Sequence, residues 1–354
     1  MLRRVLLRGA DALLPPAGVL LMRSFGIGQT QVIAAMAELG VADALGGGRL
    51  TAAQLAPRVR ADADALHRLL RMAAVDGLVR LDRRGRFRLT RLGSALRTDA
   101  PISLHAWARY MGLESTRRAW GDLTESVRTG ESAFRRVNGT SVWDWFASHP
   151  EEERLFAEAM RSLTQFDAPA LGAASMWPEQ GVVCDVAGGT GTVLAAILAR
   201  RPALRGMLVE APGVLAEAEG TLRAAGVRDR VELVEGDLLG TFEAPADVYV
   251  LKNVLHDWDD ATCACILASV RANMPPGSRL VLAEQLQERN RPHPVVSTGD
   301  LQMLTQCENG RERSREELRG LLRGAGLTPA RIERIGATAL VEGVSPPPAA
   351  GARA

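Results

Sequence analysis

A glycine-rich turn stands between an apolar run and a helical stretch in the second half of the chain. Gly188-Gly189-Thr190-Gly191 follows the run 182–186, and the stretch 193–200 comes directly after it. Glycines let a backbone approach a ligand closely, and a helix N-terminus presents unpaired N–H groups to it. The dinucleotide pattern GxGxxG is not met, because Leu194 stands where its third glycine belongs. The turn alone therefore fits either a nucleotide-like ligand or a purely structural bend.

Two acids end the next two apolar runs. Glu210 follows Gly191 by 19 residues, and Asp237 comes directly after Gly236. A carboxylate at the first position can accept hydrogen bonds from both hydroxyls of a ribose. A carboxylate at the second position can accept a hydrogen bond from the amino group of adenine. Glu210 alone would be interpreted as a solvated acid, but the three features together predict a ligand that contains adenosine.

A fourth run, DVYVLKNVLHDWDD, delivers Lys252 and then His256-Asp257 to the end of a predicted strand. Open α/β folds keep their sites at this end of the sheet. A histidine has an unperturbed pKa of about 6.5, so it can accept a proton near neutral pH. We therefore expect His256 to be a general base, against the alternative of a structural histidine. Adjacency alone leaves open whether Asp257 orients the ring.

The elements that must position these residues are strands alternating with helices. Apolar, β-branched runs recur after Pro178 and alternate with helical stretches, as in VVCDVAG, GMLVEAP, RVELVEGD, DVYVLKN and SRLVLAEQ. Such alternation predicts an α/β fold with a parallel sheet covered on both faces.

The first half of the chain has a different pattern. Helical spacing runs from Thr30 to Gly46-Gly47-Gly48, and two further helices are followed by a hairpin around Arg84-Gly85, which is typical of a winged helix. Residues 101–170 are helical and rich in aromatic side chains. We interpret the first 25 residues as an arm or first helix rather than an export signal, and the tail from Ser345 as disordered.

Composition narrows the class of protein. The 354 residues are 47% hydrophobic and 24% charged, with four scattered cysteines and no apolar run near the ~20 residues of a membrane helix. We expect a cytoplasmic protein that binds no membrane. Residues 1–100 carry 16 arginines and 8 acidic residues. This basic segment suits either a solvated surface or, as a rival hypothesis, a DNA-binding regulator.

Several segments in order resemble one enzyme family. DVAGGTG, LKNVLHDWDD and NGRERS are similar to the cofactor loop, catalytic segment and GxER[ST] signature of metal-independent, S-adenosylmethionine-dependent small-molecule O-methyltransferases, the plant caffeate and bacterial polyketide-tailoring type. RTGESAF, VNGTSVWDWFASHPEE and FAEAM resemble its substrate-domain landmarks. The resemblance covers about residues 30–343. In place of the first glycine of the family's usual triplet stands Ala187, a departure expected to matter little.

The resemblance implies an architecture. It predicts a helical, winged-helix-like dimerisation and substrate-lining domain over residues 1–170, a Rossmann-like seven-stranded methyltransferase domain over 171–344, and a disordered tail over 345–354. It also implies a homodimer, a small aromatic substrate and no nucleic-acid partner.

The resemblance also implies roles for individual residues. S-adenosyl-L-methionine would be the cofactor, and no metal is expected. The catalytic residues would be His256 with the flanking Glu284 and Glu312. The cofactor-binding residues would be Asp185, Gly189, Gly191, Glu210, Asp237, Leu238 and Lys252. The substrate-lining residues would be Phe156, Met160, Asn253 and Met303, although Phe156 and Met160 fit plain helix core equally well.

The implied activity is methyl transfer to a phenolic hydroxyl of an aromatic natural product such as a polyketide-like antibiotic. Some family members keep the fold and cofactor but perform hydroxylation, decarboxylation or pericyclic chemistry, and the fold does not exclude this alternative.

Overall fold

The computed structural model describes residues 9–347, so most of the predicted N-terminal arm is described, but residues 1–8 lie outside the described residues. The chain divides into two compact units, with the division between Glu114 and Ser115. Each unit has its own elements and core, and we treat them separately.

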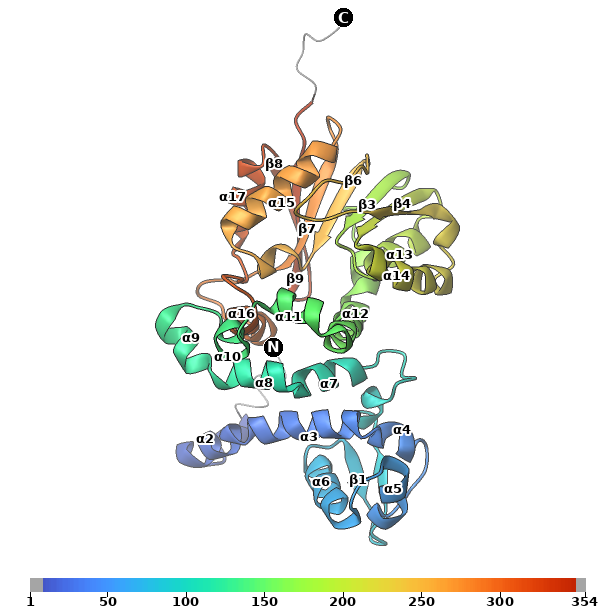
Figure 1. Ribbon diagram of the computed structural model, residues 1–354, viewed down its shortest axis with the longest axis vertical. Coiled ribbons are helices and arrows are strands. Elements are labelled where there is room, and N and C mark those ends of the chain that lie inside the picture. Colours follow the sequence, from blue (N-terminus) through green and yellow to red (C-terminus); the bar gives the residue numbers. More distant parts are fainter. Residues whose placement is uncertain (1–8, 348–354) are drawn as a thin grey trace, which may run out of the picture. The chain divides into compact units, whose positions relative to one another are not determined.

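The first unit is helical with one small sheet. Its helices and strands are α2 (Pro16–Ser24), α3 (Gly26–Glu38), α4 (Val41–Leu45), α5 (Ala52–Val59), α6 (Ala63–Val75), β1 (Val79–Leu81), β2 (Phe87–Leu89), the 3₁₀ turn η1 (Gly93–Leu96) and α7 (His105–Gly112) (Figure 1). The core gathers apolar side chains of α3 to α6 around Phe87, which is fully buried. The winged-helix order of two helices and a hairpin is confirmed.

One predicted helix is in fact two. The continuous helix expected from Thr30 to Gly46 breaks at Gly40, which has a φ of +63°. Glycine adopts this left-handed conformation without steric cost, so it ends α3 and starts α4. The apolar spacing carries across the break because both helices pack on the same core.

The second unit opens with helices. These are α8 (Glu114–Gly121), α9 (Leu123–Thr129), α10 (Ala133–Asn138), α11 (Val142–Ser148) and the long α12 (Pro150–Gly172). α12 packs on a helix of the following sheet layer, α13 (Thr192–Arg200), and Gly172 permits the close approach because a Cβ there would lie 2.4 Å from the Ala196 carbonyl oxygen. Residues 115–170 therefore belong to the same compact unit as the sheet. The functional division expected at residue 170 stays a prediction.

The remaining elements form a seven-stranded sheet and its covering helices. The strands are β3 (Gly181–Val186), β4 (Leu204–Glu210), β5 (Val231–Glu235), β6 (Val248–Lys252), β7 (Arg279–Gln285), β8 (Thr328–Ile335) and β9 (Thr338–Val344). The helices are α13, α14 (Pro212–Ala224), α15 (Asp260–Asn273), α16 (Pro294–Gln306) and α17 (Arg315–Gly324), with the 3₁₀ turns η2 (Arg228–Arg230) and η3 (Leu255–Asp257).

The strand order is β5-β4-β3-β6-β7-β9-β8. The first five strands are parallel, whereas β9 runs antiparallel between β7 and β8. Chain order reverses between β3 and β6, which makes this the switch point where open α/β sheets bind ligands. The five runs predicted as strands are all strands, and the predicted α/β architecture is confirmed.

Helices lie on both sides of this sheet (Figure 1), and an apolar core fills the space on each side. One contains side chains of α15 and α17, and the other contains side chains of α12, α13 and α14. Central strands are buried on both faces, which is why their sequences read as continuous apolar runs. The sheet is a rigid platform, and its carboxyl edge carries the site.

The end of the chain is ordered slightly further than expected. Ser345 is buried, and its backbone pairs with Ser278 and Gly277 beside the sheet, so the predicted tail does not begin there. Residues 348–354 lie outside the described residues. Among the described helices, none is both long and apolar enough to cross a membrane.

Candidate active site

The glycine turn lies at the carboxyl end of β3, at the switch point. Gly189 and Gly191 have φ values of +58° and +73°, and a Cβ at Gly188 would lie 2.4 Å from the carboxyl carbon of Asp185. Only glycine meets these demands without strain. The turn therefore needs its glycines, and it leaves backbone N–H groups at the start of α13 for a ligand.

Ala187 matters more than its sequence position suggested. It has a φ of +54°, in the left-handed region that a Cβ disfavours. An alanine in this conformation costs about 1–2 kcal/mol. The expectation that this departure from the family's triplet matters little is therefore wrong for stability, since the chain holds a strained residue at the entrance to the turn.

Glu210 ends β4 and contacts the turn directly. Its Oε1 accepts the Gly189 N–H at 3.0 Å, and its Oε2 accepts the Ala211 N–H at 2.9 Å. Burial raises the pKa of Glu210. The backbone N–H of Gly236 donates to the Glu210 carbonyl, which brings the end of β5 beside Glu210. The next two residues are Asp237, which is exposed, and Leu238, which is half-buried. The structure thus brings together the turn and the ends of β4 and β5.

Asp185 is a buried residue near the end of β3, shortly before the glycine turn. Neither of its carboxylate oxygens has a hydrogen-bond partner among the described residues. Burial, and then the charge of Glu210, raise the pKa of Asp185 to about 7. A buried carboxylate without partners is costly, and it fits a ligand that brings a cation or hydrogen-bond donors. This observation supports a site for the positively charged donor inferred from the motifs.

Lys252 ends β6 and is largely buried. Its Nζ lies 3.3 Å from the Thr164 hydroxyl and 3.7 Å from a carboxylate oxygen of Asp167, both on α12. These two partners were not predicted, because nothing in a helical sequence marks which face meets a strand end more than 80 residues later. They fix the ammonium group near Asp185, whose pKa it lowers.

His256 lies on η3, four residues past β6. Its Nδ1 is 3.1 Å from Oε1 of Glu312, and the imidazole is only 13% exposed. The backbone N–H of Glu312 donates a hydrogen bond of 2.9 Å to Oδ1 of Asp300 on α16. Gly299 of α16 also lies close to this carboxylate, since a Cβ there would lie 3.2 Å from Oε1 of Glu312.

Glu284 completes the group from β7. Its Oε1 accepts the N–H groups of Val254 and Leu255 at 3.1 and 2.9 Å, while its Oε2 lies 4.0 Å from Nδ1 of His256. The carboxylate thus holds the backbone that leads to His256 and also adds negative charge beside its ring. The three residues predicted to be catalytic lie together.

Charge sets the proton affinity of the imidazole. Burial alone would lower the pKa of His256, but the carboxylates of Asp257, Glu312 and Glu284 outweigh it and raise that pKa well above its usual value. Burial also raises the pKa of Glu284, although His256 opposes that rise. With Nδ1 directed at Glu312, Nε2 is the nitrogen left to accept a proton, and a carboxylate oxygen of Asp257 lies 3.5 Å from it.

Arg313 is a functional residue that the sequence analysis missed. Its guanidinium group is almost fully buried and donates to the carbonyls of Leu255 and Trp258, on either side of His256, and to Asp260. Two residues earlier, the Arg311 N–H donates to the His256 carbonyl at 2.8 Å. The segment 310–314 therefore clamps the loop that carries His256. The only sequence signal was its place in the NGRERS segment.

An aromatic cluster begins two residues after His256. Trp258 stacks on Trp143 of α11 with ring centres 5.8 Å apart, and Phe156 of α12 stacks on Phe146 at 4.8 Å. Trp143 joins the two pairs through its edge-to-face contact with Phe156 at 6.0 Å. Phe156 was predicted to line a substrate pocket, and the structure places it in a cluster that extends to the His256 loop. The two tryptophans were not predicted.

The other three predicted substrate residues lie at separate positions. Asn253 is half-buried with a φ of +51°, and its side-chain oxygen is buried without a partner among the described residues. Met160 lies half-buried on α12, one turn after Phe156, and Met303 lies half-buried on α16. Their substrate roles remain predictions.

His256, Glu284 and Glu312 also place three potential ligand atoms within 4.8 Å of one another. That spacing is compatible with a metal ion as well as with a hydrogen-bonded base. By contrast, Cys263 is buried and Cys265 is exposed on α15, so these two thiols face different sides of the helix.

Two family models match the chain. A model described as an O-methyltransferase domain matches residues 120–328, and one described as an O-methyltransferase dimerisation domain matches residues 23–99.

Individual relatives agree with these models. O-demethylpuromycin-O-methyltransferase of Streptomyces alboniger is 38% identical over 313 residues, covering 87% of this chain and 83% of the relative. Aclacinomycin 10-hydroxylase RdmB of Streptomyces purpurascens is 35% identical over 86% of this chain and 82% of its own. The solved structure of the neocarzinostatin O-methyltransferase NcsB1, with S-adenosyl-L-homocysteine and 1,4-dihydroxy-2-naphthoic acid, matches with a TM-score of 0.76 and 31% identity over 90% of this chain and 96% of that one.

Proposed function

This chain belongs to the S-adenosylmethionine-dependent O-methyltransferases, and on that premise we propose that it methylates a phenolic hydroxyl of an aromatic, polyketide-like natural product with His256 as general base. The family expected from the motifs is confirmed, and S-adenosyl-L-methionine is its methyl donor. The observation that carries the role of the histidine is the contact of its Nδ1 with Glu312, which leaves Nε2 to accept a proton.

The cofactor residues follow from the switch point. Glu210 would hold the ribose hydroxyls, while Asp237 and Leu238 would contact the adenine. Gly189 and Gly191 would face the methionine part, where Asp185 and Lys252 supply buried charges of opposite sign. When bound, S-adenosyl-L-methionine supplies an already activated methyl group. The protein then has to align the acceptor oxygen and remove its proton.

His256 performs the proton transfer. Nε2 would accept the proton of the acceptor hydroxyl, and the carboxylates of Glu312 and Glu284 would stabilise the resulting imidazolium. The cofactor would supply the methyl group, with its carbon–sulfur bond breaking and the sulfur leaving as the thioether of S-adenosyl-L-homocysteine. A phenol such as that of tyrosine has a pKa of about 10. Raising the pKa of His256 toward that value reduces the free energy needed to move the proton.

The acceptor class rests on the aromatic cluster. A flat ring could stack against the half-buried rings of Trp143, Phe156 and Trp258, whose cluster begins two residues from the base. Met160 and Met303 would supply adaptable apolar contacts, and the unpaired side-chain oxygen of Asn253 could accept a hydrogen bond from a polar substituent.

The direct test is transfer of a labelled methyl group. The protein would be incubated with methyl-labelled S-adenosyl-L-methionine and a panel of hydroxynaphthoic and hydroxybenzoic acids. We expect label in a product whose hydroxyl has become a methyl ether, and equal rates with and without EDTA, since we infer no metal at His256. Loss of activity on chelation, restored by a divalent cation, would show that the three ligand atoms hold a metal instead.

A second candidate function is non-methylating chemistry in the same site, favoured by the similarity to a hydroxylase. It would appear as a product that is chemically changed but unlabelled. Retention of His256, with Glu312 hydrogen-bonded to its Nδ1 and Glu284 4.0 Å from that atom, favours methyl transfer, because the base is needed to activate a hydroxyl.

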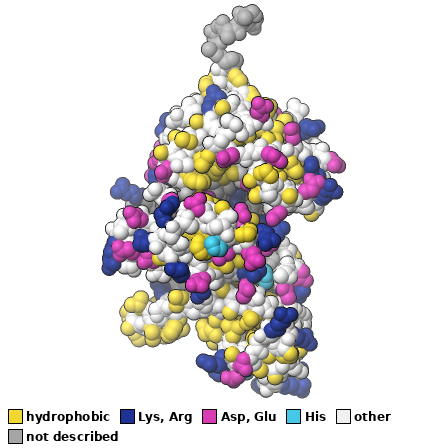
Figure 2. Space-filling model, viewed as in Figure 1, with side chains coloured by type: hydrophobic (Ala, Val, Ile, Leu, Met, Phe, Trp, Pro, Cys, Tyr) yellow, Lys and Arg dark blue, Asp and Glu magenta, His cyan; other side chains and the backbone are white. Residues whose placement is uncertain are grey.

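Homodimer formation is supported by the first unit. Large apolar side chains are exposed along α2 and at the start of α3, including Leu20 (71%) and Ile27 (78%). Figure 2 shows hydrophobic side chains gathered over α2. Contiguous exposed apolar surface is typical of a protein–protein interface, and the dimerisation-domain match begins at residue 23. Sedimentation of the full chain should give twice the monomer mass.

The cytoplasm remains the proposed compartment. All four cysteines are free thiols, and three of them are buried, which suits a reducing environment.

A further inference from the structure

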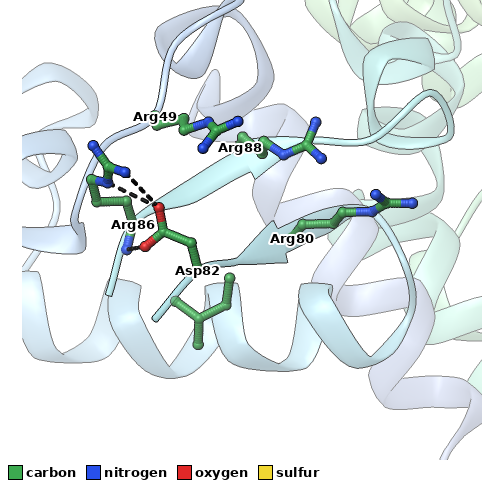
Figure 3. Close-up of a pocket in the computed structure, with 6 residues that line it drawn as sticks. Arg49, Arg80, Asp82, Arg86 and Arg88 are labelled. Carbon is green, nitrogen blue, oxygen red and sulfur yellow. Dashed lines mark hydrogen bonds and ion pairs between the residues drawn. The ribbon is translucent and has the colours of Figure 1, made fainter. Parts of the chain in front are cut away.

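An arginine-lined cavity lies on the hairpin of the first unit, apart from every residue assigned a role above. Its volume is about 210 Å³, and it is lined by Arg49, Arg80, Leu81, Asp82, Arg86 and Arg88 (Figure 3). All six residues belong to the hairpin or to the segment that pairs with it.

Strand register places three of the arginines side by side. Arg80 of β1 is directly opposite Arg88 of β2, and Leu50 pairs antiparallel with Phe87, so Arg49 comes next to Arg88 on the other side. Phe87 points into the core, which directs Arg88 to the other face of the strand. Like charges directly opposite each other destabilise a sheet. This row of cations is therefore unfavourable unless an anion lies against it.

The one acid in the cavity wall is already engaged. Oδ1 of Asp82 accepts the N–H groups of Arg84 and Arg86 at 2.8 and 3.1 Å, and its Oδ2 accepts from the Arg86 side chain at 2.9 Å. Figure 3 shows Asp82 paired with Arg86, while the guanidinium groups of Arg49, Arg80 and Arg88 point away from Asp82. None of these three guanidinium groups forms a hydrogen bond or an ion pair with another of the residues 9–347.

We propose that this cavity binds a compact phosphate anion of the diphosphate type. Guanidinium groups match phosphate oxygens two at a time, so adjacent arginines can each hold one of two linked phosphates. The Arg86–Asp82 pair keeps the hairpin closed and forms one wall.

A small anion fits better than a nucleic-acid backbone. A winged helix reads DNA with the N-terminal end of the helix before its hairpin. Here that helix is α6, which has Asp62 as its N-cap and Asp64 in its first turn. Carboxylates at this end of a helix repel phosphates. α6 also carries the exposed Arg68 and Arg71, but both come after its first turn, whereas Arg49, Arg80 and Arg88 lie side by side at the cavity.

The test titrates inorganic pyrophosphate into the full-length protein by calorimetry at low salt. We expect one anion per chain, and about tenfold weaker binding or more for Arg80→Ala and for Arg88→Ala, since each loses charged hydrogen bonds. Arg83→Ala is the matched control, because it removes an exposed arginine of the same hairpin that does not line the cavity; its affinity should stay within about twofold of the wild type.

Thermal melting without the anion shows that each variant folds, and removal of Arg80 should not lower the melting temperature because it relieves like-charge repulsion. No binding of pyrophosphate by the wild type would overturn the proposal. So would equal weakening by Arg83→Ala, which would indicate diffuse attraction. Tighter binding of a random DNA duplex, with Arg83 as important as Arg80, would assign the surface to nucleic acid instead.

Discussion

The Nδ1 atom of His256 lies 3.1 Å from Oε1 of Glu312, although the two residues are 56 positions apart in the chain. The contact fixes which ring nitrogen carries the hydrogen and which one is open. It also places a buried negative charge where an imidazolium would form. The proposed proton transfer depends on this contact.

Replacing the base should slow the chemical step and leave the cofactor site intact. We expect His256→Ala to lower turnover by about 10²–10⁴-fold, the usual contribution of a general base. Calorimetry should find the affinity for S-adenosyl-L-homocysteine nearly unchanged, since no cofactor residue is altered. An unchanged rate would mean that alignment alone drives the reaction and that the histidine is structural.

Glu210→Ala should weaken S-adenosyl-L-homocysteine binding by about 10–100-fold, because it removes the carboxylate proposed to accept hydrogen bonds from both ribose hydroxyls. The same change frees the Gly189 N–H and loosens the glycine turn. Glu217→Ala is the control, since Glu217 is an exposed acid on α14. Similar affinities for both variants would remove Glu210 from the cofactor site.

Arg313→Lys should lower turnover while retaining the positive charge. A lysine cannot donate to the Leu255 and Trp258 carbonyls together, and each buried acceptor left unpaired costs about 1–3 kcal/mol. We expect a lower melting temperature and a reduced maximal rate with little change in S-adenosyl-L-homocysteine affinity. Arg315→Lys is the control, because it changes an exposed arginine two residues further on and should behave like the wild type. Full activity of Arg313→Lys would argue against the clamp.

Ala187→Gly should stabilise the protein by about 1 kcal/mol, because it removes the left-handed strain at the entrance to the turn. Chemical or thermal unfolding would measure the gain. Ala224→Gly serves for comparison: Ala224 is exposed within α14, so this glycine relieves no strain and should destabilise the protein by up to about 1 kcal/mol. A loss of stability in Ala187→Gly would contradict the assignment of strain.

Much of this arrangement was predictable from local patterns. Several strands are apolar runs that end at a glycine, an acid or Lys252, and parallel strands bring such ends to one edge, so Glu210, Asp237 and Lys252 could be assigned together. Glu284 and Glu312 followed only from the resemblance to the family. What escaped prediction depends on contacts distant in sequence. An arginine in a charged segment is ordinarily solvated, and nothing local indicated that Arg313 would be buried between two carbonyls. The stacking of Trp143 on Trp258 and the backbone conformation of Ala187 likewise exist only in the folded chain.

The raised pKa of His256 has a definite consequence for pH dependence. Below that pKa the imidazole is protonated and cannot act as a base, so methyl transfer should increase as the pH rises above 7. A histidine with the unperturbed pKa of about 6.5 would instead give a rate that levels off near neutrality. Glu312→Gln removes one negative charge beside the ring, so it should move the rise in rate to lower pH.

The most direct measurement is the pKa of His256 itself, obtained by NMR titration of protein labelled at its five histidines. The His256→Ala variant identifies the signal, and no acceptor is needed. We expect a pKa well above 6.5 for His256 in the wild-type protein and a lower one in Glu312→Gln. A value near 6.5 that Glu312→Gln leaves unchanged would contradict this expectation, because Glu312 would then neither hold nor charge the base.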